Sequence, residues 1–246
     1  MELTCVVPAY NEESRLGETL RRVTEYLDSE SRDYEIIVVD DGSVDATASV
    51  AAAHAARSPR CRMVRLGRNS GKGAAVRRGV LEARGDLILF TDADLSTPIE
   101  ELDRLGGAIA AGGDIAIGSR ALPDSRVEVH QPWVRERMGK MFNLLIRLIL
   151  MRGFGDTQCG FKLFRGPVAR DLFQRARLDR FAFDVEILFL ARRGGYAVSE
   201  VPVRWINSPA TKVRMLRDSS RMLCDLLRIR LLQLRGCYRR CSESPR

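Results

Sequence analysis

The sequence predicts an α/β protein with a mostly parallel, twisted sheet and helices on both of its faces. Short apolar runs alternate with longer segments of helical periodicity, which is typical of βαβ units joined by right-handed crossovers. Several of the apolar runs end in acidic or glycine-containing clusters, which is where open sheets of this kind bind ligands. With 246 residues, 45% of them apolar, the chain can bury the core of such a domain.

The first half of the chain is predicted to alternate strands and helices. Residues 34–39 are rich in β-branched side chains, which favour a strand. Residues 87–90 form a short apolar run that ends at Thr91, which predicts a buried strand. Pro98 suits the first position of a helix, with Thr97 as the N-cap. The predicted elements are strands over residues 2–8, 34–39, 62–66, 87–90 and 114–118, and helices that end at residue 27, cover 45–57 and 71–84, and begin at residue 98.

After residue 120 the pattern becomes less regular. Residues 120–132 are polar and irregular, so we expect a loop. Residues 133–151 are predicted to be helical, with an apolar face that consists of Phe142, Leu145, Ile146 and Ile149. The remaining predictions are strands over residues 156–164 and 198–205, a helix over residues 183–191, and a long helix from residue 213 onward.

The positive charge is concentrated at the C-terminal end. Residues 204–246 carry eleven basic and three acidic side chains, which accounts for the whole net charge of +8. We therefore divide the chain into a domain over residues 1–212 and a basic helical tail over residues 213–246. The tail is amphipathic, and two interpretations remain open: packing on the domain, favoured for its first half, or lying on anionic lipid, favoured for residues 228–240. Its apolar stripe is Leu216, Leu223, Leu227, Leu231 and Leu234.

Composition argues against several classes of protein. None of the six cysteines forms a CxxC pair, which leaves a zinc or thioredoxin-like site unsupported. Two histidines are too few for a histidine-based site. No apolar run reaches the roughly 20 residues that cross a bilayer, and we expect no signal peptide. Nucleic-acid binding through the tail is not expected, because the tail lacks interleaved aromatic residues.

The strongest candidate site is Asp92 and Asp94, two carboxylates one residue apart directly after a predicted buried strand. Such a pair is too exposed and too close together to belong to a core. Hard divalent cations take oxygen ligands and commonly bridge to substrate phosphates. The pair is therefore predicted to hold a metal–diphosphate group.

Three other clusters allow two interpretations each. Residues 40–43 (Asp-Asp-Gly-Ser) can form a turn, or can accept hydrogen bonds from a base or ribose, and the same holds for residues 8–12. Residues 71–73 (Gly-Lys-Gly) fit neither the P-loop nor the dinucleotide pattern, but this glycine-rich start of a helix could still contact phosphate. The basic residues of the second half, taken singly, fit solvated surface charge: Arg120, Arg135, Arg137 and Lys212.

Five motifs in succession resemble the nucleotide-sugar half of a family 2 glycosyltransferase with the GT-A (Rossmann-like) fold. They occur at residues 7–12, 40–43, 69–73, 92–95 and 118–120. The resemblance extends from about residue 3 to about residue 213, and each motif lies at the predicted end of a strand or start of a helix. It implies that residues 1–120 form a nucleotide-sugar-binding half and residues 121–212 an acceptor half.

Later motifs resemble one branch of that family, the polyprenyl-phosphate glycosyltransferases. These motifs lie at residues 156–162, 183–186 and 200–203, together with Lys212. The Gln-Cys-Gly-Phe-Lys form within the first of them is most like the dolichyl-phosphate β-glucosyltransferases, whereas the mannosyl branch carries a Ser-Gly-Phe-Arg-like variant. Many relatives also carry transmembrane helices, and this chain shows none, so the resemblance implies that it reaches lipid from the bilayer surface.

The resemblance implies a role for each matching residue. The nucleotide-sugar contacts would come from Pro8, Tyr10, Glu12, Asp40, Asp41, Lys72 and Asp92. Catalysis and metal binding would fall to Asp92 and Asp94, with Asp94 the better metal ligand. The acceptor side would consist of Arg120, Gln158, Asp184, Glu186, Lys212 and either Arg135 or Arg137.

The implied reaction is an inverting transfer of glucose from UDP-glucose to a polyprenyl phosphate, assisted by Mg²⁺ or Mn²⁺. A phosphate monoester is already anionic and needs no strong general base, which fits the scarcity of histidine. The alternatives are GDP-mannose as donor, another acceptor, or a non-catalytic binding protein, against which the intact Asp92 and Asp94 argue. We expect a peripheral enzyme on the cytoplasmic face of a membrane, and homo-oligomerisation is left open.

Overall fold

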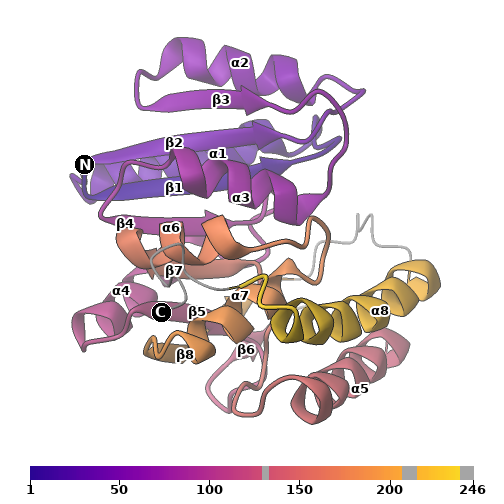
Figure 1. Cartoon of the computed structure of the whole chain (residues 1–246). Coiled ribbons are helices and arrows are strands. Elements are labelled where there is room, and N and C mark those ends of the chain that lie inside the picture. Colours follow the sequence, from indigo (N-terminus) through magenta and orange to yellow (C-terminus); the bar gives the residue numbers. More distant parts are fainter. Residues whose placement is uncertain (129–132, 207–214, 239–246) are drawn as a thin grey trace, which may run out of the picture.

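A seven-stranded sheet runs through the protein (Figure 1). The computed structural model describes residues 1–128, 133–206 and 215–238, and their side chains except at 133–136, 138, 140 and 215–220. The strands are β1 (Leu3–Ala9), β2 (Tyr34–Asp40), β3 (Cys61–Arg65), β4 (Leu87–Thr91), β5 (Ile115–Ser119), β6 (Arg126–Val127), β7 (Phe161–Arg165), β8 (Val198–Pro202) and β9 (Arg204–Trp205). The helices are α1 (Leu16–Ser29), α2 (Thr47–Arg57), α3 (Lys72–Glu82), the 3₁₀ turn η1 (Ile99–Glu101), α4 (Leu102–Ala110), α5 (Trp133–Ile149), α6 (Gly166–Arg175), α7 (Phe183–Arg193) and α8 (Met215–Leu234).

The sheet has the order β3-β2-β1-β4-β7-β5-β8, and β7 alone among these strands runs antiparallel to both of its neighbours. Strands β1 and β2 are buried along their whole length, as expected for parallel strands covered on both faces. The short strands β6 and β9 form a separate parallel pair. The predicted fold class is thereby confirmed.

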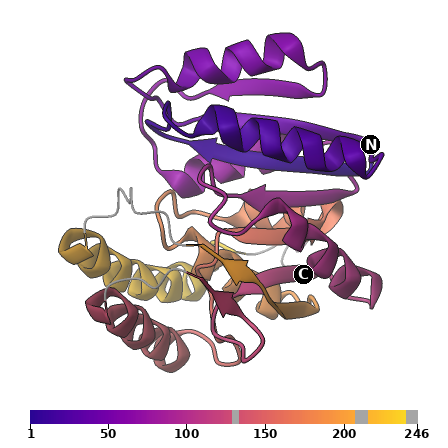
Figure 2. The same ribbon diagram turned by 180° about the vertical axis from the view of Figure 1, so that it is seen from behind.

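Helices cover both faces of the sheet, and each face has its own hydrophobic core. Helices α3 and α6 lie on the face seen in Figure 1, with α7 and α8 beside them, and α1 and α4 cover the opposite face, as Figure 2 shows. The side chains of β1 divide between the two cores, because alternate residues of a strand point to opposite faces. Val6 joins the core beneath α3, whereas Cys5 and Val7 join the core beneath α1.

Several predicted elements need correction. Helix α6 was not predicted, and β6 lies inside the segment expected to be an irregular loop. Strand β7 begins at Phe161 and not at residue 156, because the preceding residues form turns and polar contacts. Pro98 occupies the N-cap of η1 and not a first helical position, and the hydroxyl of Thr97 lies 3.6 Å from the Cys159 sulfur instead of capping a helix.

The two long helices of the second half, α5 and α8, pack against each other, and both also expose large apolar side chains. The predicted apolar face of α5 does turn inward, with Ile146 fully buried. Helix α8 packs through Leu226 and Ile229, and the described members of the predicted apolar stripe do not form the packing face. Its described members are exposed: Leu223, Leu227, Leu231 and Leu234.

Candidate functional site

The carboxyl ends of β1, β2 and β4 meet at one edge of the sheet, and the site is built there. Asp40 is the last residue of β2 and Asp41 follows it, and both carboxylates accept hydrogen bonds from backbone amides. Asp40 accepts a hydrogen bond from the Ser43 amide (2.9 Å), and its other oxygen lies 3.1 Å from Arg65 Nε. Asp41 accepts hydrogen bonds from the amides of Ser70 (2.7 Å) and Gly71 (2.8 Å). The turn interpretation of these aspartates is correct, and a contact with a ligand remains a prediction.

The segment after β1 is joined to the segment after β2. Asn11 donates its amide hydrogen to the Ser43 hydroxyl (2.9 Å), and the Glu12 amide donates to the Thr47 hydroxyl (2.6 Å). Pro8 is buried at the end of β1, and Tyr10 is half-buried beside it. The residues predicted to line a uridine pocket therefore lie on two loops that brace each other.

Asp92 and Asp94 follow β4 and lie in different surroundings. Asp92 Oδ1 is 2.7 Å from the Lys72 ammonium, and its amide donates to the Gly160 carbonyl (3.1 Å). Asp94 accepts a hydrogen bond from the Ser96 amide (3.0 Å), and its second oxygen is 3.8 Å from the nearest Arg15 nitrogen. Burial, and after it the negative charge of Asp92, raise the pKa of the Asp94 carboxyl.

Gly160 permits the close approach of β7 to Asp92. A Cβ atom at this position would overlap the Asp92 carboxylate. The motif before β7 thus contacts this edge of the sheet directly, because β7 pairs with β4 in antiparallel register and begins beside the end of β4. The third residue of the motif at 158–162 is glycine for this steric reason.

Lys72 opens α3 and links two acidic groups. Burial would lower the pKa of its ammonium, but the carboxylates of Asp92 and Asp184 outweigh burial, and the pKa is raised. The ammonium also lies 5.1 Å from the centre of the Phe90 ring. Lys72 therefore keeps its positive charge next to the predicted diphosphate site.

Lys162 was missed by sequence reasoning as a site residue. Its side chain is fully buried, and its ammonium donates to the Cys159 carbonyl (2.6 Å) and pairs with Asp184. Burial raises the pKa of Asp184, although Lys162 and Lys72 both oppose that effect. A lysine inside the apolar strand β7 was the available signal, because a buried lysine requires a carboxylate partner.

Arg120 forms a bidentate ion pair with Asp156. The guanidinium donates to the two carboxylate oxygens at 2.6 and 2.9 Å and lies 5.3 Å from the Trp205 ring centre. Burial opposes the charge of Asp156, yet Arg120 outweighs it and lowers the pKa of that carboxyl. Glu200, also missed, supports this pair, because its carboxylate accepts from the Asp156 amide (2.8 Å) and the Ser119 hydroxyl (2.6 Å).

The remaining predicted acceptor residues do not all gather at this edge. Gln158 is half-buried, and its backbone amide donates a hydrogen bond to the Asp156 carboxylate (3.0 Å), so Gln158 lies beside the Arg120–Asp156 pair. Glu186 is fully buried, and its carboxylate accepts hydrogen bonds from two backbone amides and a tyrosine hydroxyl. Arg137 is exposed on α5. The Arg135 side chain and Lys212 lie outside the described residues.

Two wider properties of the described part of the chain bear on function. Within residues 1–128, 133–206 and 215–238, no three His, Cys, Asp or Glu side chains gather into a group that could hold a metal ion by itself. Over the same ranges, every helix is too short or too polar to cross a membrane.

Comparison with curated proteins shows close relatives of one kind. Dolichyl-phosphate beta-glucosyltransferase of Drosophila melanogaster is 39% identical, over 98% of this chain and 78% of the relative. The proteins of the same name from Dictyostelium discoideum and Homo sapiens are each 36% identical. Those alignments cover 96% and 97% of this chain and 76% and 78% of the relatives, respectively.

Solved structures share the fold. Mannosyl-3-phosphoglycerate synthase from Rubrobacter xylanophilus superposes with a TM-score of 0.68 at 24% identity, over 100% of this chain and 79% of that chain. Glucosyl-3-phosphoglycerate synthase from Mycobacterium tuberculosis, solved in complex with Mn²⁺ and UDP-glucose, gives a TM-score of 0.68 at 18% identity, over 96% and 79%. At these identities the likeness concerns the fold alone, and it confirms the expected GT-A architecture.

The family follows from the whole chain and not from one motif. The model of "Glycosyl transferase family 2" matches residues 4–173, which include most of β1, all strands from β2 to β7, and the residues described above at the ends of β1, β2 and β4. The curated relatives extend the match through α8. The protein is therefore a glycosyltransferase that belongs to glycosyl transferase family 2.

Proposed function

We propose that this enzyme transfers glucose from UDP-glucose to a polyprenyl phosphate of the dolichyl type and inverts the anomeric centre. The observation that carries the proposal is the juxtaposition of Lys72, Asp92 and Asp94 at the carboxyl edge of the sheet, with the motif before β7 in contact with Asp92. The names of the 36–39% identical relatives support both the sugar and the acceptor. The fold neighbour solved with UDP-glucose supports the donor.

The donor would lie along this edge from the loops after β1 and β2 to Asp94. Uridine would contact the braced segment formed by residues 8–12 and 40–43. Its diphosphate would reach Lys72, whose positive charge is maintained by two carboxylates. The sugar would then lie between the ends of β4 and β7. This arrangement gives residues 1–120 the nucleotide-sugar role and residues 121–212 the acceptor role.

The chemistry of Asp94 fits a divalent cation. Burial and the neighbouring Asp92 make negative charge unfavourable at Asp94, and a bound cation would relieve both effects. Asp92 is already paired with Lys72, so Asp94 is the better ligand of the two. Because no protein cluster completes a site among the described residues, the other ligands would be diphosphate oxygens and water, as is usual for Mg²⁺. Mg²⁺ or Mn²⁺ bound there would stabilise charge on the leaving diphosphate.

The acceptor phosphate would be held by Arg120. Two N–H groups of its guanidinium are on Asp156, which fixes the plane of the group and leaves another edge for a phosphate. An acceptor oxygen forms the new bond to the anomeric carbon while the bond to the UDP oxygen breaks. Since the attacking phosphate is already anionic, the residues around it need to position it and not to remove a proton.

A donor panel tests this function. The protein is incubated with radiolabelled UDP-glucose, UDP-galactose, UDP-N-acetylglucosamine or GDP-mannose and a polyprenyl phosphate, with and without divalent metal. We expect labelled glycolipid from UDP-glucose with metal present. Product from GDP-mannose alone would overturn the choice of sugar, and no product from any donor would favour a non-catalytic binding protein.

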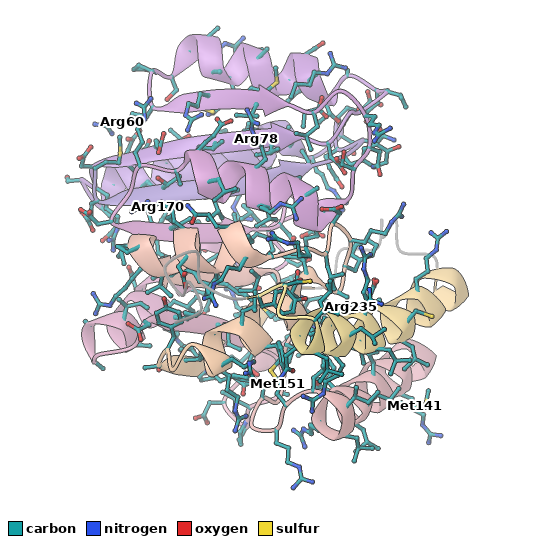
Figure 3. The ribbon with its side chains drawn as sticks, in the orientation of Figure 1. Arg60, Arg78, Met141, Met151, Arg170 and Arg235 are labelled. Carbon is teal, nitrogen blue, oxygen red and sulfur yellow. The ribbon has the colours of Figure 1, made fainter. Side chains whose placement is uncertain are left out.

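The second half supports contact with a bilayer surface. Seven large apolar side chains on the neighbouring helices α5 and α8 are exposed: Met141, Leu144, Leu148, Leu223, Leu227, Leu231 and Leu234. Figure 3 places Met141 on α5 and Arg235 directly after the end of α8. A depression of about 470 Å³ lies at the end of α5, lined by Leu144, Leu148 and Phe154 together with Arg147 and Arg152.

Apolar side chains interspersed with arginines match the chemistry of an anionic membrane surface, where the apolar groups enter the acyl boundary and the cations meet headgroups. We therefore assign α5 and α8 to peripheral docking on anionic lipid, on the cytoplasmic side where UDP-sugars are available. Flotation with vesicles that contain anionic phospholipid should bring the protein to the lipid fraction. A protein that instead stays in the soluble fraction and forms dimers in light scattering would assign this face to a second copy.

A further inference from the structure

Glu186 is a fully buried carboxylate near the site, and its hydrogen bonds are all to groups inside the protein. It lies on α7 with no exposed surface. One oxygen accepts hydrogen bonds from the Arg177 amide (2.9 Å) and the Tyr238 hydroxyl (2.6 Å), and the other accepts from the Leu178 amide (2.9 Å). Its carboxylate therefore holds the loop between α6 and α7 from the inside and joins it to the chain beyond α8.

That loop forms the wall against which α3 begins. The Asp179 carbonyl accepts a hydrogen bond from the Ala74 amide (3.0 Å), and the Asp179 carboxylate pairs with Arg77 (2.6 Å). A Cβ atom at Gly71 would overlap the Asp179 carbonyl, and one at Gly73 would overlap the Leu178 carbonyl. The first turn of α3 thus lies directly against the segment that Glu186 holds.

Lys72 belongs to this first turn. Its neighbours on both sides contact the loop, and its ammonium reaches Asp92 at 2.7 Å. A shift of the loop would therefore move the start of α3 and the ammonium together. The position of the Lys72 ammonium next to the proposed diphosphate therefore depends on the Glu186 carboxylate.

Tyr238 reaches Glu186 because the chain reverses after α8. Gly236 adopts a left-handed backbone conformation with a φ of 71°, and the Cys237 amide donates to the Leu232 carbonyl (3.0 Å), which closes the helix end. The chain then directs Tyr238 into the core, where its ring packs edge-on against Phe189 with centroids 6.5 Å apart. Tyr238 is 8% exposed, and its hydroxyl is buried with Glu186.

We infer that Tyr238 is a positioning residue of the donor site, which acts through Glu186 and the loop at residues 177–179 to place Lys72 against the diphosphate. The segment after α8 is then part of the catalytic domain and not only a docking element. This inference deepens the proposed function and rests on it for the identity of the ligand. The placement of α3 itself does not depend on that identity.

The Tyr238→Phe variant tests the inference, because it removes one hydroxyl and keeps the ring packed on Phe189. Tyr34→Phe is the matched control, since its hydroxyl also donates to a carboxylate, Asp28 at 2.9 Å, away from this edge. Affinities for UDP and for uridine are measured by calorimetry. In Tyr238→Phe we expect UDP to bind about fivefold more weakly, a part of what a hydrogen bond to a charged group is worth, and uridine to bind as before. Tyr34→Phe should change neither affinity.

Hydrogen exchange gives a second readout that needs no ligand. The Ala74 amide and its neighbours in the first turn of α3 should exchange faster in Tyr238→Phe and at the original rate in Tyr34→Phe. Unchanged exchange there, or equal weakening of UDP and uridine, would overturn the inference. If the unaltered protein fails to bind UDP while the exchange difference is present, the proposed function is wrong and the positioning role stands.

Discussion

The sheet edge of residues 1–120 and the outer surface of helices α5 and α8 use their side chains in opposite ways. In residues 1–120, the acidic groups at the sheet edge are engaged inward: Asp41 holds two backbone amides, and Asp92 holds Lys72. In the second half, α5 and α8 leave large apolar side chains exposed, and Leu234 reaches 79% exposure. A small, charged donor is recognised by groups fixed in advance, whereas a lipid acceptor requires a surface that stays apolar and open. The contrast supports a donor half and an acceptor half, and each prediction below tests one side of it.

The largest effect is expected at Asp94. Asp94→Ala would remove the proposed metal ligand, and with it the proposed stabilisation of the leaving diphosphate, so transfer should fall by about a thousandfold or more. Chelation of divalent metal should reproduce the loss in the unaltered enzyme. Glycolipid formation is measured, and circular dichroism checks the fold. The control is Asp86→Ala, at an exposed position at the start of β4. Full activity in Asp94→Ala would contradict the proposal that Asp94 binds a divalent metal in the donor half.

Gly160→Ala tests whether the donor edge is fixed in advance by the second half. The added methyl group would overlap the Asp92 carboxylate and separate it from Lys72. A displacement of this size near reacting groups costs about a hundredfold in kcat/KM. Gly107→Ala is the matched control, because nothing lies within 4 Å of a Cβ at that helical position. Equal kinetics of the two variants would contradict a rigid donor edge.

Arg120→Met tests, through stability, the buried ion pair at the boundary between the two halves, which we assign to the acceptor phosphate. It leaves Asp156 buried without its partner, and such losses are about 3 kcal/mol in the free energy of unfolding. With Arg120 present, the pKa of Asp156 lies below the ordinary 3.8, so the stabilisation exists above that pH and is lost as the pH falls through the lowered pKa.

The difference in the free energy of unfolding between Arg120→Met and the unaltered protein should therefore be largest near neutral pH and smaller below pH about 4, as measured by urea unfolding. The double variant Arg120→Met/Asp156→Asn should recover part of the loss at neutral pH, because it removes the unpaired charge. A gap that is independent of pH would assign the loss to packing on Trp205.

The smallest effect concerns docking. Replacing Leu227 and Leu231 on α8 by serine should weaken binding to anionic vesicles about tenfold, since each exposed leucine contributes part of its transfer free energy when it enters lipid. Leu81→Ser on α3 is the control, because Leu81 is also exposed (41%) but lies in the donor half. Co-sedimentation measures the affinity. Equal binding of all three proteins would contradict the assignment of α8 to lipid.

Much of the fold could be predicted because local and global signals agree. Strands such as β2 and β4 contain continuous runs of four apolar residues, and their ends carry the motifs that the structure brings together. Helix α6, which follows β7 without a break, was missed because no segment between residues 164 and 183 was assigned to an element. The partner of the apolar stripe of α8 was left open because periodicity identifies an apolar face but not what it contacts, and α8 packs through other residues, Leu226 and Ile229.

The polar partners within the site were less predictable. Asp92 and Asp94 could be found from their position after a strand, but the pairing of Asp92 with Lys72 and of Lys162 with Asp184 joins segments 20 or more residues apart. Sequence motifs name the participants without saying which of them neutralise one another. Glu186 illustrates the limit, since its motif suggested the acceptor side and the structure shows a carboxylate engaged with backbone and Tyr238.

The reversed strand β7 has a consequence for how the protein folds. It lies between β4 and β5, two strands that are nearer in sequence to each other than to β7, so the sheet cannot be completed until residues 161–165 have been added. The Asp92–Gly160 contact closes a long loop, and such contacts form slowly. The donor edge is therefore completed late, after most of the chain has been synthesised. We conclude that the first 120 residues alone would lack the β7 side of this edge, and nucleotide-sugar binding would report that the sheet has closed.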